Sequence, residues 1–160
     1  MINLEQLGWE AHTIGELDHQ KLKAPHVKLR ALTTGGHGDG VFSVDLRINR
    51  PNNGEYLSTT ELHSFEHFLL YGFKKYLPQN FISVAPMGCQ TGFYLILLNE
   101  GDAEKICGIY ESILNDILVA TEVPYANIRE CGHYENHDLG MAQGVARKLL
   151  DARSEWRKVV

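Results

Sequence analysis

The segment 63–67 (HSFEH) carries the side chains with the clearest potential for chemistry. On a helix, positions i and i+4 lie on one face about one turn apart, so His63 and His67 can share one metal ion. Glu66 projects beside the same position and can carry protons rather than bind the ion. The alternative is a pair of partly exposed histidines on an amphipathic helix, because an H-x-x-x-H pattern also arises by chance.

Cys131, which precedes Gly132, offers a third ligand. A short strand is predicted at 126–131, and a thiolate at its end would complete a site with the two imidazoles. Three protein ligands leave one coordination position open, which is the arrangement of catalytic zinc sites. A buried and inert cysteine is the alternative. His137 is interpreted as a helix-start residue rather than as a ligand.

Cys89 lies between two glycines in the segment 86–92 (PMGCQTG), directly before an apolar run. Glycines let the backbone bend sharply and approach a ligand closely, so a thiol in such a turn is accessible to a substrate. A nearby cation would move its pKa toward the thiolate form. A packing cysteine in a tight turn explains the pattern equally well. The remaining cysteine, Cys107, is interpreted as a filler residue in a helix.

His19 and Arg47 are polar residues that can orient a substrate. Arg47 falls on the polar face of a predicted strand, two positions after Asp45, so an ion pair between these two residues is an equally good explanation of the arginine. The residues alone therefore predict a mononuclear metal site with a nearby thiol, and they do not specify a reaction.

Three strands are predicted to support these side chains, at 26–34, 41–48 and 91–98. The second strand alternates between apolar and polar residues, which predicts one buried face, as in an antiparallel sheet. The third is almost entirely apolar and is predicted to be a central strand covered on both faces. The glycine-rich segment 35–40 provides a turn between the first two.

Three helices are predicted from capping signals and apolar spacing. Ser58 and Glu61 form a capping box, and the helix that follows should end near Leu77, before a proline. Residues 102–121 have the spacing of an amphipathic helix, and Asn136 can cap a last helix. Because strands and helices are mixed without strict alternation, we expect an α+β fold built on an antiparallel sheet.

The composition is that of an ordinary globular protein. The chain has 160 residues, of which 44% are apolar and 22% are charged, so we expect residues 1–160 to form a single domain. The net charge of −5 argues against nucleic acid or an anionic membrane as a partner. The segment MINLEQLGWE lacks the pattern of a signal peptide, and apolar runs are short, so we expect a cytoplasmic protein whose cysteines are free.

In their order along the chain, these segments resemble the S-ribosylhomocysteine lyase family, the LuxS-type enzymes that make the precursor of autoinducer-2. The resemblance runs from about Leu17 to Trp156. Each motif is weak by itself, and their order within one chain is specific. The matching segments are 17–19 (LDH), 24–25 (AP), 45–47 (DLR), 51–52 (PN), 62–67 (LHSFEH), 86–94 (PMGCQTGFY), 131–132 (CG) and 137–139 (HDL).

The resemblance implies a metal-dependent carbon–sulfur lyase. His63, His67 and Cys131 match the family's ligands for one divalent ion, which is Fe²⁺ in the family, with Zn²⁺ or Co²⁺ as substitutes. Cys89 and Glu66 match its two proton carriers. The implied reaction converts S-ribosyl-L-homocysteine to homocysteine and 4,5-dihydroxy-2,3-pentanedione, through aldose–ketose isomerisation and β-elimination.

The resemblance also implies a two-layer α+β sandwich and a homodimer with its sites at the interface. His19 and Arg47 match positions that line the family's substrate pocket. Two positions depart from the family pattern, because Ile14 replaces a serine and Ser83 replaces an often acidic residue. Both family positions lie near the pocket, so the departures bear on substrate contacts and leave the metal ligands and the thiol in place.

Two other functions fit part of the pattern. H-x-x-E-H is also the inverted zincin motif of metallopeptidases, but such enzymes usually take a carboxylate as third ligand, and Cys89 would then have no role. A non-catalytic metal-binding or ligand-binding domain is suggested by Ile14 and Ser83. The presence of both Glu66 and Cys89 argues against that reading, because a purely structural site needs neither.

Overall fold

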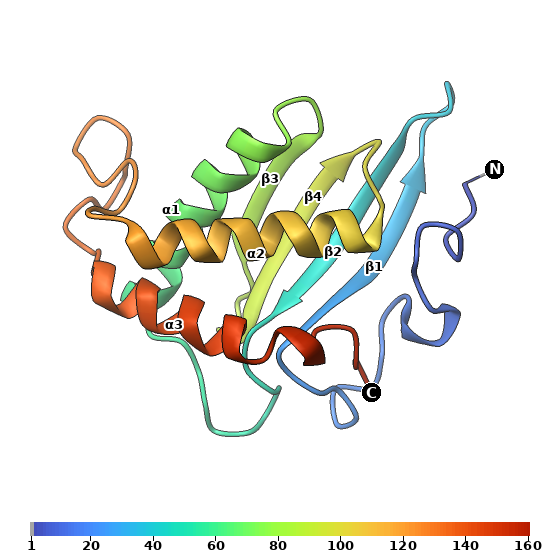
Figure 1. The fold of residues 1–160 in the computed structure, drawn as a ribbon, viewed down its shortest axis with the longest axis horizontal. Coiled ribbons are helices and arrows are strands. Elements are labelled where there is room, and N and C mark those ends of the chain that lie inside the picture. Colours follow the sequence, from blue (N-terminus) through green and yellow to red (C-terminus); the bar gives the residue numbers. More distant parts are fainter. Residues whose placement is uncertain (1) are drawn as a thin grey trace.

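In the computed structural model, which describes residues 2–160, a four-stranded sheet is covered on one face by α-helices (Figure 1). Each strand is antiparallel to its neighbours, and the order across the sheet is β1-β2-β4-β3. The predicted α+β class is therefore confirmed. The strands are β1 (His26–Thr34), β2 (Gly40–Arg47), β3 (Phe81–Pro86) and β4 (Gly92–Leu98).

The helices begin at side chains that bind free backbone amides. At the start of α1 (Thr59–Tyr76), the Ser58 hydroxyl accepts from the Glu61 amide and the Glu61 carboxylate accepts from the Ser58 amide, so the predicted capping box is confirmed. An aspartate caps each of α2 (Ala103–Val119) and α3 (Leu139–Asp151). Short 3-10 helices span Ala11–Thr13 and Arg153–Glu155.

The core lies between the helical layer and the inner face of the sheet. Alternate residues of β2 and β4 point toward the helices, as the period of a strand requires. The apolar stripes of the helices meet them and are almost completely buried. The buried residues at this contact include Phe42, Val44, Leu46, Phe93, Leu95, Leu97, Phe65, Leu69, Phe73, Ile106, Ile113 and Ile117.

Gly92 allows the two central strands to approach each other at one end. It pairs with Arg47, and a Cβ atom at Gly92 would lie 2.5 Å from the carbonyl oxygen of Leu46, which is too close for any side chain. The start of β4 therefore lies directly against the end of β2 that carries Arg47.

Two of the element predictions were wrong, and one strand was not predicted. Residues 126–131 form turns instead of a strand, because the Glu130 and Cys131 amides both donate to the Asn127 carbonyl. The cap of α3 is Asp138 rather than Asn136. The unpredicted strand is β3, a short edge strand with an irregular register, whose weak apolar pattern gave little signal.

The outer face of the sheet is less covered than the sequence suggested. In β4, Tyr94, Ile96 and Leu98 are only half-buried, whereas their neighbours on the inner face are buried. The neighbouring edge strand exposes about half of Ile82 (51%). The prediction that β4 is covered on both faces therefore fails for the outer side. Within residues 2–160, none of the helices is both long enough and apolar enough to span a bilayer.

Gly72 sits where α1 contacts α2. A Cβ atom at Gly72 would lie 2.5 Å from Cγ1 of the buried Ile113, so we expect Gly72→Ala to destabilise the fold by about 1–3 kcal/mol through overpacking. Gly108 on α2 has nothing within 4 Å of the same position. Gly108→Ala should therefore be neutral or stabilise by up to about 1 kcal/mol through helix propensity. Urea unfolding of both variants measures the difference, and equal effects would contradict this account of the contact.

Candidate metal centre and thiol site

α1 places His63 and His67 on one face, with ring centroids 4.7 Å apart and ring planes nearly perpendicular (87°). Nδ1 of His63 lies 3.1 Å from the Asn136 carbonyl oxygen, and Nδ1 of His67 lies 2.7 Å from the Pro124 carbonyl oxygen. A carbonyl only accepts, so Nδ1 of His67 carries the hydrogen. The same tautomer of His63 satisfies the Asn136 carbonyl, which lies closer to Nδ1 than the Asn136 side-chain amide nitrogen does at 3.3 Å. The Nε2 lone pairs are therefore available to a metal ion, and the second ring nitrogens are held as in known metal sites.

Cys131 completes this arrangement from a turn in the chain between α2 and α3. Its Sγ lies 3.3 Å from Nε2 of His63. The ligand atoms of His63, His67, Cys131 and His137, which we call the metal group, all lie within 4.8 Å of one another. Imidazole and thiolate donors suit Fe²⁺, Co²⁺ and Zn²⁺. The structure thus brings the three predicted ligands together, and their chemistry fits one divalent ion.

His137 was interpreted as a helix-start residue, and it does directly precede the cap of α3. Its ring also lies within the metal group, with Nε2 3.5 Å from Sγ of Cys131. Burial and the neighbouring His63 and His67 lower the pKa of His137 to about 4. Burial also lowers the pKa of His63, with His67 adding to the effect. Both imidazoles are therefore neutral at neutral pH.

Glu66 lies on the same helix, directly before His67. Its side chain is half-buried, and burial raises the pKa of its carboxyl group, although His67 opposes the shift. Within residues 2–160 the carboxyl group makes no hydrogen bond to another side chain or to the backbone. Glu66 can therefore hold a proton closer to neutral pH than an ordinary glutamate does.

Cys89 is exposed in the turn between β3 and β4. The bend is made by Gln90, which has a positive φ of 61° and donates its amide to the Met87 carbonyl, so neither flanking glycine takes the left-handed conformation. Gln90 also pairs with Leu57 through two hydrogen bonds of 2.9 Å. The turn is thereby tied to the chain that leads into α1.

Arg47 forms the ion pair with Asp45 that the sequence suggested, and it also contacts the turn that carries Cys89. It is 3% exposed, and its Nη2 donates to Oδ2 of Asp45 at 2.7 Å, so the polar face of β2 is buried at this end, contrary to prediction. Its Nη1 donates to Thr91 Oγ1 at 2.7 Å and lies 3.9 Å from Cys89 Sγ. We call Arg47, Cys89 and Thr91 the thiol group.

Within the thiol group, Thr91 and Arg47 lower the pKa of Cys89. Burial alone would raise this pKa, but hydrogen bonds with Thr91, whose Oγ1 lies 3.0 Å from the sulfur, and the charge of Arg47 bring it below its ordinary value. Thr91 was not singled out in the sequence, where only its place two residues after Cys89 hints at the contact. An exposed thiol with a lowered pKa is a reactive one.

His19 and Arg47 line the same small pocket of about 150 Å³, together with Lys28, Arg30 and Tyr94. This pocket adjoins the thiol group through Arg47. A separate depression of about 310 Å³ borders the metal group at His67 and is lined by Leu70, Lys74, Tyr125 and Glu130. The hydrogen bonds of Cys89 go to Arg47 and Thr91, and within residues 2–160 none reaches the metal group.

The two departures from the family pattern lie outside these pockets. Ile14 packs against the core, and its neighbour Gly15 lines the pocket of His19. Ser83 is exposed on β3, opposite Ile96. Neither residue contributes to the metal group or the thiol group.

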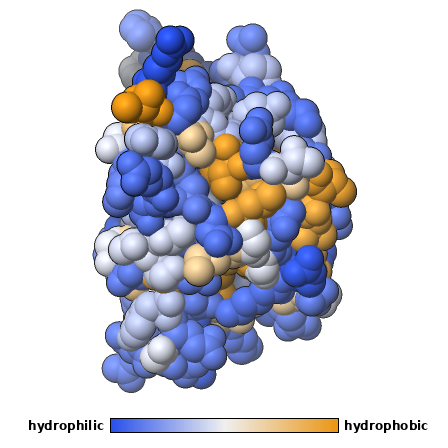
Figure 2. Space-filling view, turned by 90° about the vertical axis from the view of Figure 1, so that its left-hand side faces the viewer, coloured by the Kyte–Doolittle hydropathy of each residue, from blue (hydrophilic) through white to orange (hydrophobic). Residues whose placement is uncertain are grey.

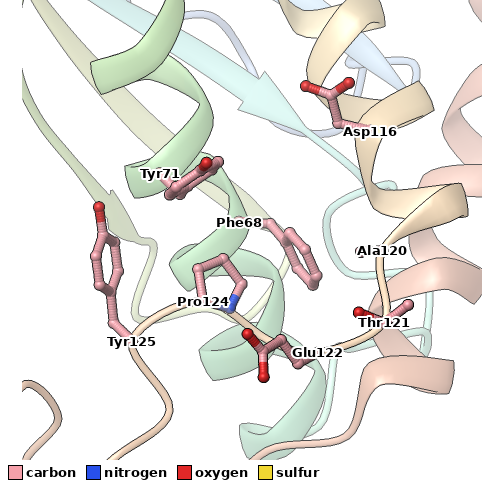
Figure 3. Close-up of a pocket in the computed structure, with 8 residues that line it drawn as sticks. All are labelled: Phe68, Tyr71, Asp116, Ala120, Thr121, Glu122, Pro124 and Tyr125. Atoms are coloured by element: carbon pink, nitrogen blue, oxygen red, sulfur yellow. The ribbon is translucent and has the colours of Figure 1, made fainter.

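A third pocket of about 380 Å³ lies between α1, the end of α2 and the chain that follows it (Figure 3). Phe68 and Tyr71 from α1 and Pro124 and Tyr125 from the later chain surround it, with Asp116 at its side. On the side of the molecule where the chain between α2 and α3 lies, hydrophobic residues cluster among hydrophilic ones (Figure 2). The pocket contains none of the predicted site residues.

An antiparallel sheet with one helical layer and a histidine–cysteine metal group defines an α+β protein with a candidate metal centre. A profile of the S-ribosylhomocysteinase (LuxS) family matches residues 15–160. The S-ribosylhomocysteine lyases of Chromohalobacter salexigens and Halobacillus halophilus are each 43% identical over 143 residues, which is 89% of this chain and 91% and 93% of theirs. A Listeria monocytogenes lyase is 41% identical over 89% of this chain and 91% of its own length. The chain belongs to the S-ribosylhomocysteine lyase family.

The lowered pKa of Cys89 is testable by alkylation with iodoacetamide as a function of pH. The thiolate is the reacting form, so the midpoint of the rate profile should lie below that of an ordinary cysteine. Thr91→Val removes the closest hydrogen bond, so the midpoint should rise and the rate at neutral pH should fall several-fold. Mass spectrometry of the Cys89 peptide separates this signal from that of the buried Cys107. Thr33→Val, at an exposed position on β1, is the matched control, and an unchanged midpoint in Thr91→Val would contradict the assignment.

Proposed function

We propose that this protein is a metal-dependent S-ribosylhomocysteine lyase that converts S-ribosyl-L-homocysteine to homocysteine and 4,5-dihydroxy-2,3-pentanedione. The observation that carries the proposal is the metal group, in which His63, His67 and Cys131 present their ligand atoms to one point beside Glu66. Family membership supports the same activity, because the relatives are named for it. We propose that residues 1–160 act as one domain, in the cytoplasm, where a free thiol stays reduced.

We propose one divalent ion per chain, held by His63, His67 and Cys131. Fe²⁺ is the ion expected for the family, and Co²⁺ or Zn²⁺ has the same ligand preferences. Three protein ligands leave one position for the substrate. When bound, the ion supplies Lewis-acid polarisation of a substrate oxygen.

Cys89 is proposed to move protons between sugar carbons. The thioether bond breaks readily only after a carbonyl has been moved next to it by aldose–ketose shifts, because the sulfur can then leave by β-elimination. A thiolate with a lowered pKa and an exposed position can take a proton from one carbon and return it to its neighbour. Arg47 and His19, which share a pocket beside the thiol, are proposed to orient the sugar.

Glu66 is proposed to serve the hydroxyl protons and the final elimination. Its raised pKa supports this role, because a carboxyl group becomes a more effective acid and base as its pKa moves toward the working pH. Its place on α1 beside the metal group, away from the hairpin that carries Cys89, supports an approach from another side of the substrate.

We propose that the active form is a homodimer in which the thiol group of one protomer serves the metal group of its partner. The half-buried outer residues Tyr94, Ile96 and Leu98 and the exposed Ile82 supply an apolar surface on the sheet face that lacks the helical layer (Figure 1). Such a face suits an isologous contact with a second copy. It also explains why no hydrogen bond of Cys89 reaches the metal group of its own chain within residues 2–160.

The activity is tested by thiol release from S-ribosylhomocysteine with the Fe²⁺-loaded or Co²⁺-loaded protein. Cys89→Ala and Glu66→Gln should each lower the rate by roughly 10²–10⁴-fold while the bound metal is retained, because each removes one proton carrier. Cys107→Ala, at the buried thiol on α2, should leave the rate unchanged. A metallopeptidase would instead cleave peptides and release no thiol.

The order of the two roles is resolved with substrate that carries deuterium at sugar C2. We expect Cys89→Ala to abolish exchange of the label, which NMR follows, because the first isomerisation no longer occurs. Glu66→Gln should exchange the label and accumulate a ketose intermediate. Exchange at the wild-type rate in Cys89→Ala would show that Cys89 is not the carbon base.

The shared site is tested by mixing two inactive proteins. A mixed dimer of Cys89→Ala and Glu66→Gln chains has one site in which an intact thiol group meets a metal group with Glu66 beside it, so part of the activity should return. Cys89→Ala mixed with Arg47→Met is the control, because both changes fall in the thiol group and no site is intact. An inactive first mixture, or a fully active monomer in sedimentation, would refute the shared site.

A further inference from the structure

We propose that His137 is a positioning residue of the metal group, whose Nε2–H donates a hydrogen bond to the Cys131 thiolate and which does not itself bind the ion. This inference rests on the metal site of the proposed function. It gives a role to the His137 ring, which lies within the metal group although His63, His67 and Cys131 already supply three ligands.

The ring positions distinguish His137 from the two histidines of α1. In a tetrahedral site with metal–nitrogen bonds of about 2.1 Å, two imidazoles bound through Nε2 have centroids about 5 Å apart. The centroids of His63 and His67 are 4.7 Å apart and their rings meet edge to face, which suits two ligands of one ion. The ring of His137 lies only 4.0 Å from that of His63, with a tilt of 34°, and 4.4 Å from that of His67, with a tilt of 59°, so both distances are shorter than the one between the two rings of α1. His137 therefore lies over the face of His63 instead of converging with it.

The partner of Nδ1 indicates the tautomer of each ring. In His67, Nδ1 meets a carbonyl oxygen and must donate. In His63, Nδ1 lies 3.1 Å from the Asn136 carbonyl oxygen, to which it can donate, and 3.3 Å from the side-chain amide nitrogen of the same residue. In His137, Nδ1 lies 3.3 Å from the hydroxyl of Ser64, and that hydroxyl already accepts the Asp138 amide at 2.9 Å. The Ser64 hydroxyl hydrogen is then directed to Nδ1.

This hydrogen-bond chain leaves the hydrogen of His137 on Nε2, which lies 3.5 Å from Sγ of Cys131. The His133 amide donates to the same sulfur at 3.4 Å, so the thiolate has two N–H donors. Such donors draw electron density from the sulfur, hold the ligand in place and preserve the Lewis acidity of the ion. They also leave the open coordination position to the substrate.

The test uses Co²⁺-loaded protein, because cobalt reports its ligands by X-ray absorption and its thiolate bond by a sulfur-to-metal charge-transfer band. The wild type should show two imidazoles and one sulfur, and His137→Ala should show the same set. Loss of the hydrogen bond makes the thiolate easier to oxidise, so the band of His137→Ala should shift to lower energy. Competition with a chelator should reveal a Co²⁺ affinity roughly 10–100-fold weaker, the usual cost of losing an outer partner.

Two further variants separate a hydrogen bond from a general structural effect. His137→Gln keeps an N–H donor of similar reach and should restore much of the band position. His133→Ala keeps the backbone amide that meets the sulfur, and its ring centroid lies 6.4 Å from that of His63, so its band should match the wild type. Circular dichroism checks that each variant is folded.

Three imidazoles in the wild type and two in His137→Ala would overturn the inference, because His137 would then be a ligand. An unshifted band in His137→Ala would also overturn it, because the thiolate would not have lost a donor. A wild-type protein that binds no Co²⁺ would instead refute the metal site itself, and with it both the proposed function and this inference.

Discussion

The chain between α2 and α3 has no strand or helix to fix its position, so it depends on hydrogen bonds to α1. His63 and His67 bind the carbonyls of Asn136 and Pro124, and Ser64 binds the Asp138 amide. The same ring hydrogens that hold this chain against α1 orient the opposite ring nitrogens toward Cys131. The same hydrogen bonds therefore fix the loop and orient the candidate ligands, because a neutral imidazole that donates from Nδ1 has its lone pair at Nε2. This explains how an irregular segment can hold a thiol in a defined place.

Local signals predicted the elements whose stability is itself local. The Ser58–Glu61 capping box and the proline after Leu77 set both ends of α1, and the bounds of β1 matched the prediction. The errors occurred where tertiary contacts decide. Asn136 and Asp138 are both good caps, and the second prevails while the carbonyl of the first accepts from His63. β3 exists because β4 offers it an edge, which no pattern within residues 81–86 reveals.

In the candidate site, too, local signals predicted some of the residues, and the others depend on tertiary contacts. The i, i+4 spacing of His63 and His67 is a property of any helix, so the sequence alone placed them together. Their meeting with Cys131 needed either the family resemblance or the fold, since a loop separates them. The contacts of Thr91 and the ring position of His137 could not be predicted, because a threonine directly before a strand and a histidine before a helix carry no signal until their neighbours are known. The burial of Arg47 could not be predicted for a related reason. Alternation shows that a strand has a polar face, but it does not show whether solvent reaches that face.

The strand order has a consequence for the growing chain. β2 is followed by α1 and β3, yet its partner in the sheet is β4, so one edge of β2 stays unpaired until all three later elements have left the ribosome. Pairing of β2 with β4 also delivers Thr91 to Arg47, so the surroundings of Cys89 form in the same step as the centre of the sheet. A nascent chain that stalls before β4 would expose an apolar sheet edge, and Arg47 would lack its hydrogen bond to Thr91. Such an intermediate is prone to aggregation and would bind chaperones. In the completed chain, β2 and β4 are paired and the residues that make Cys89 reactive are already in place.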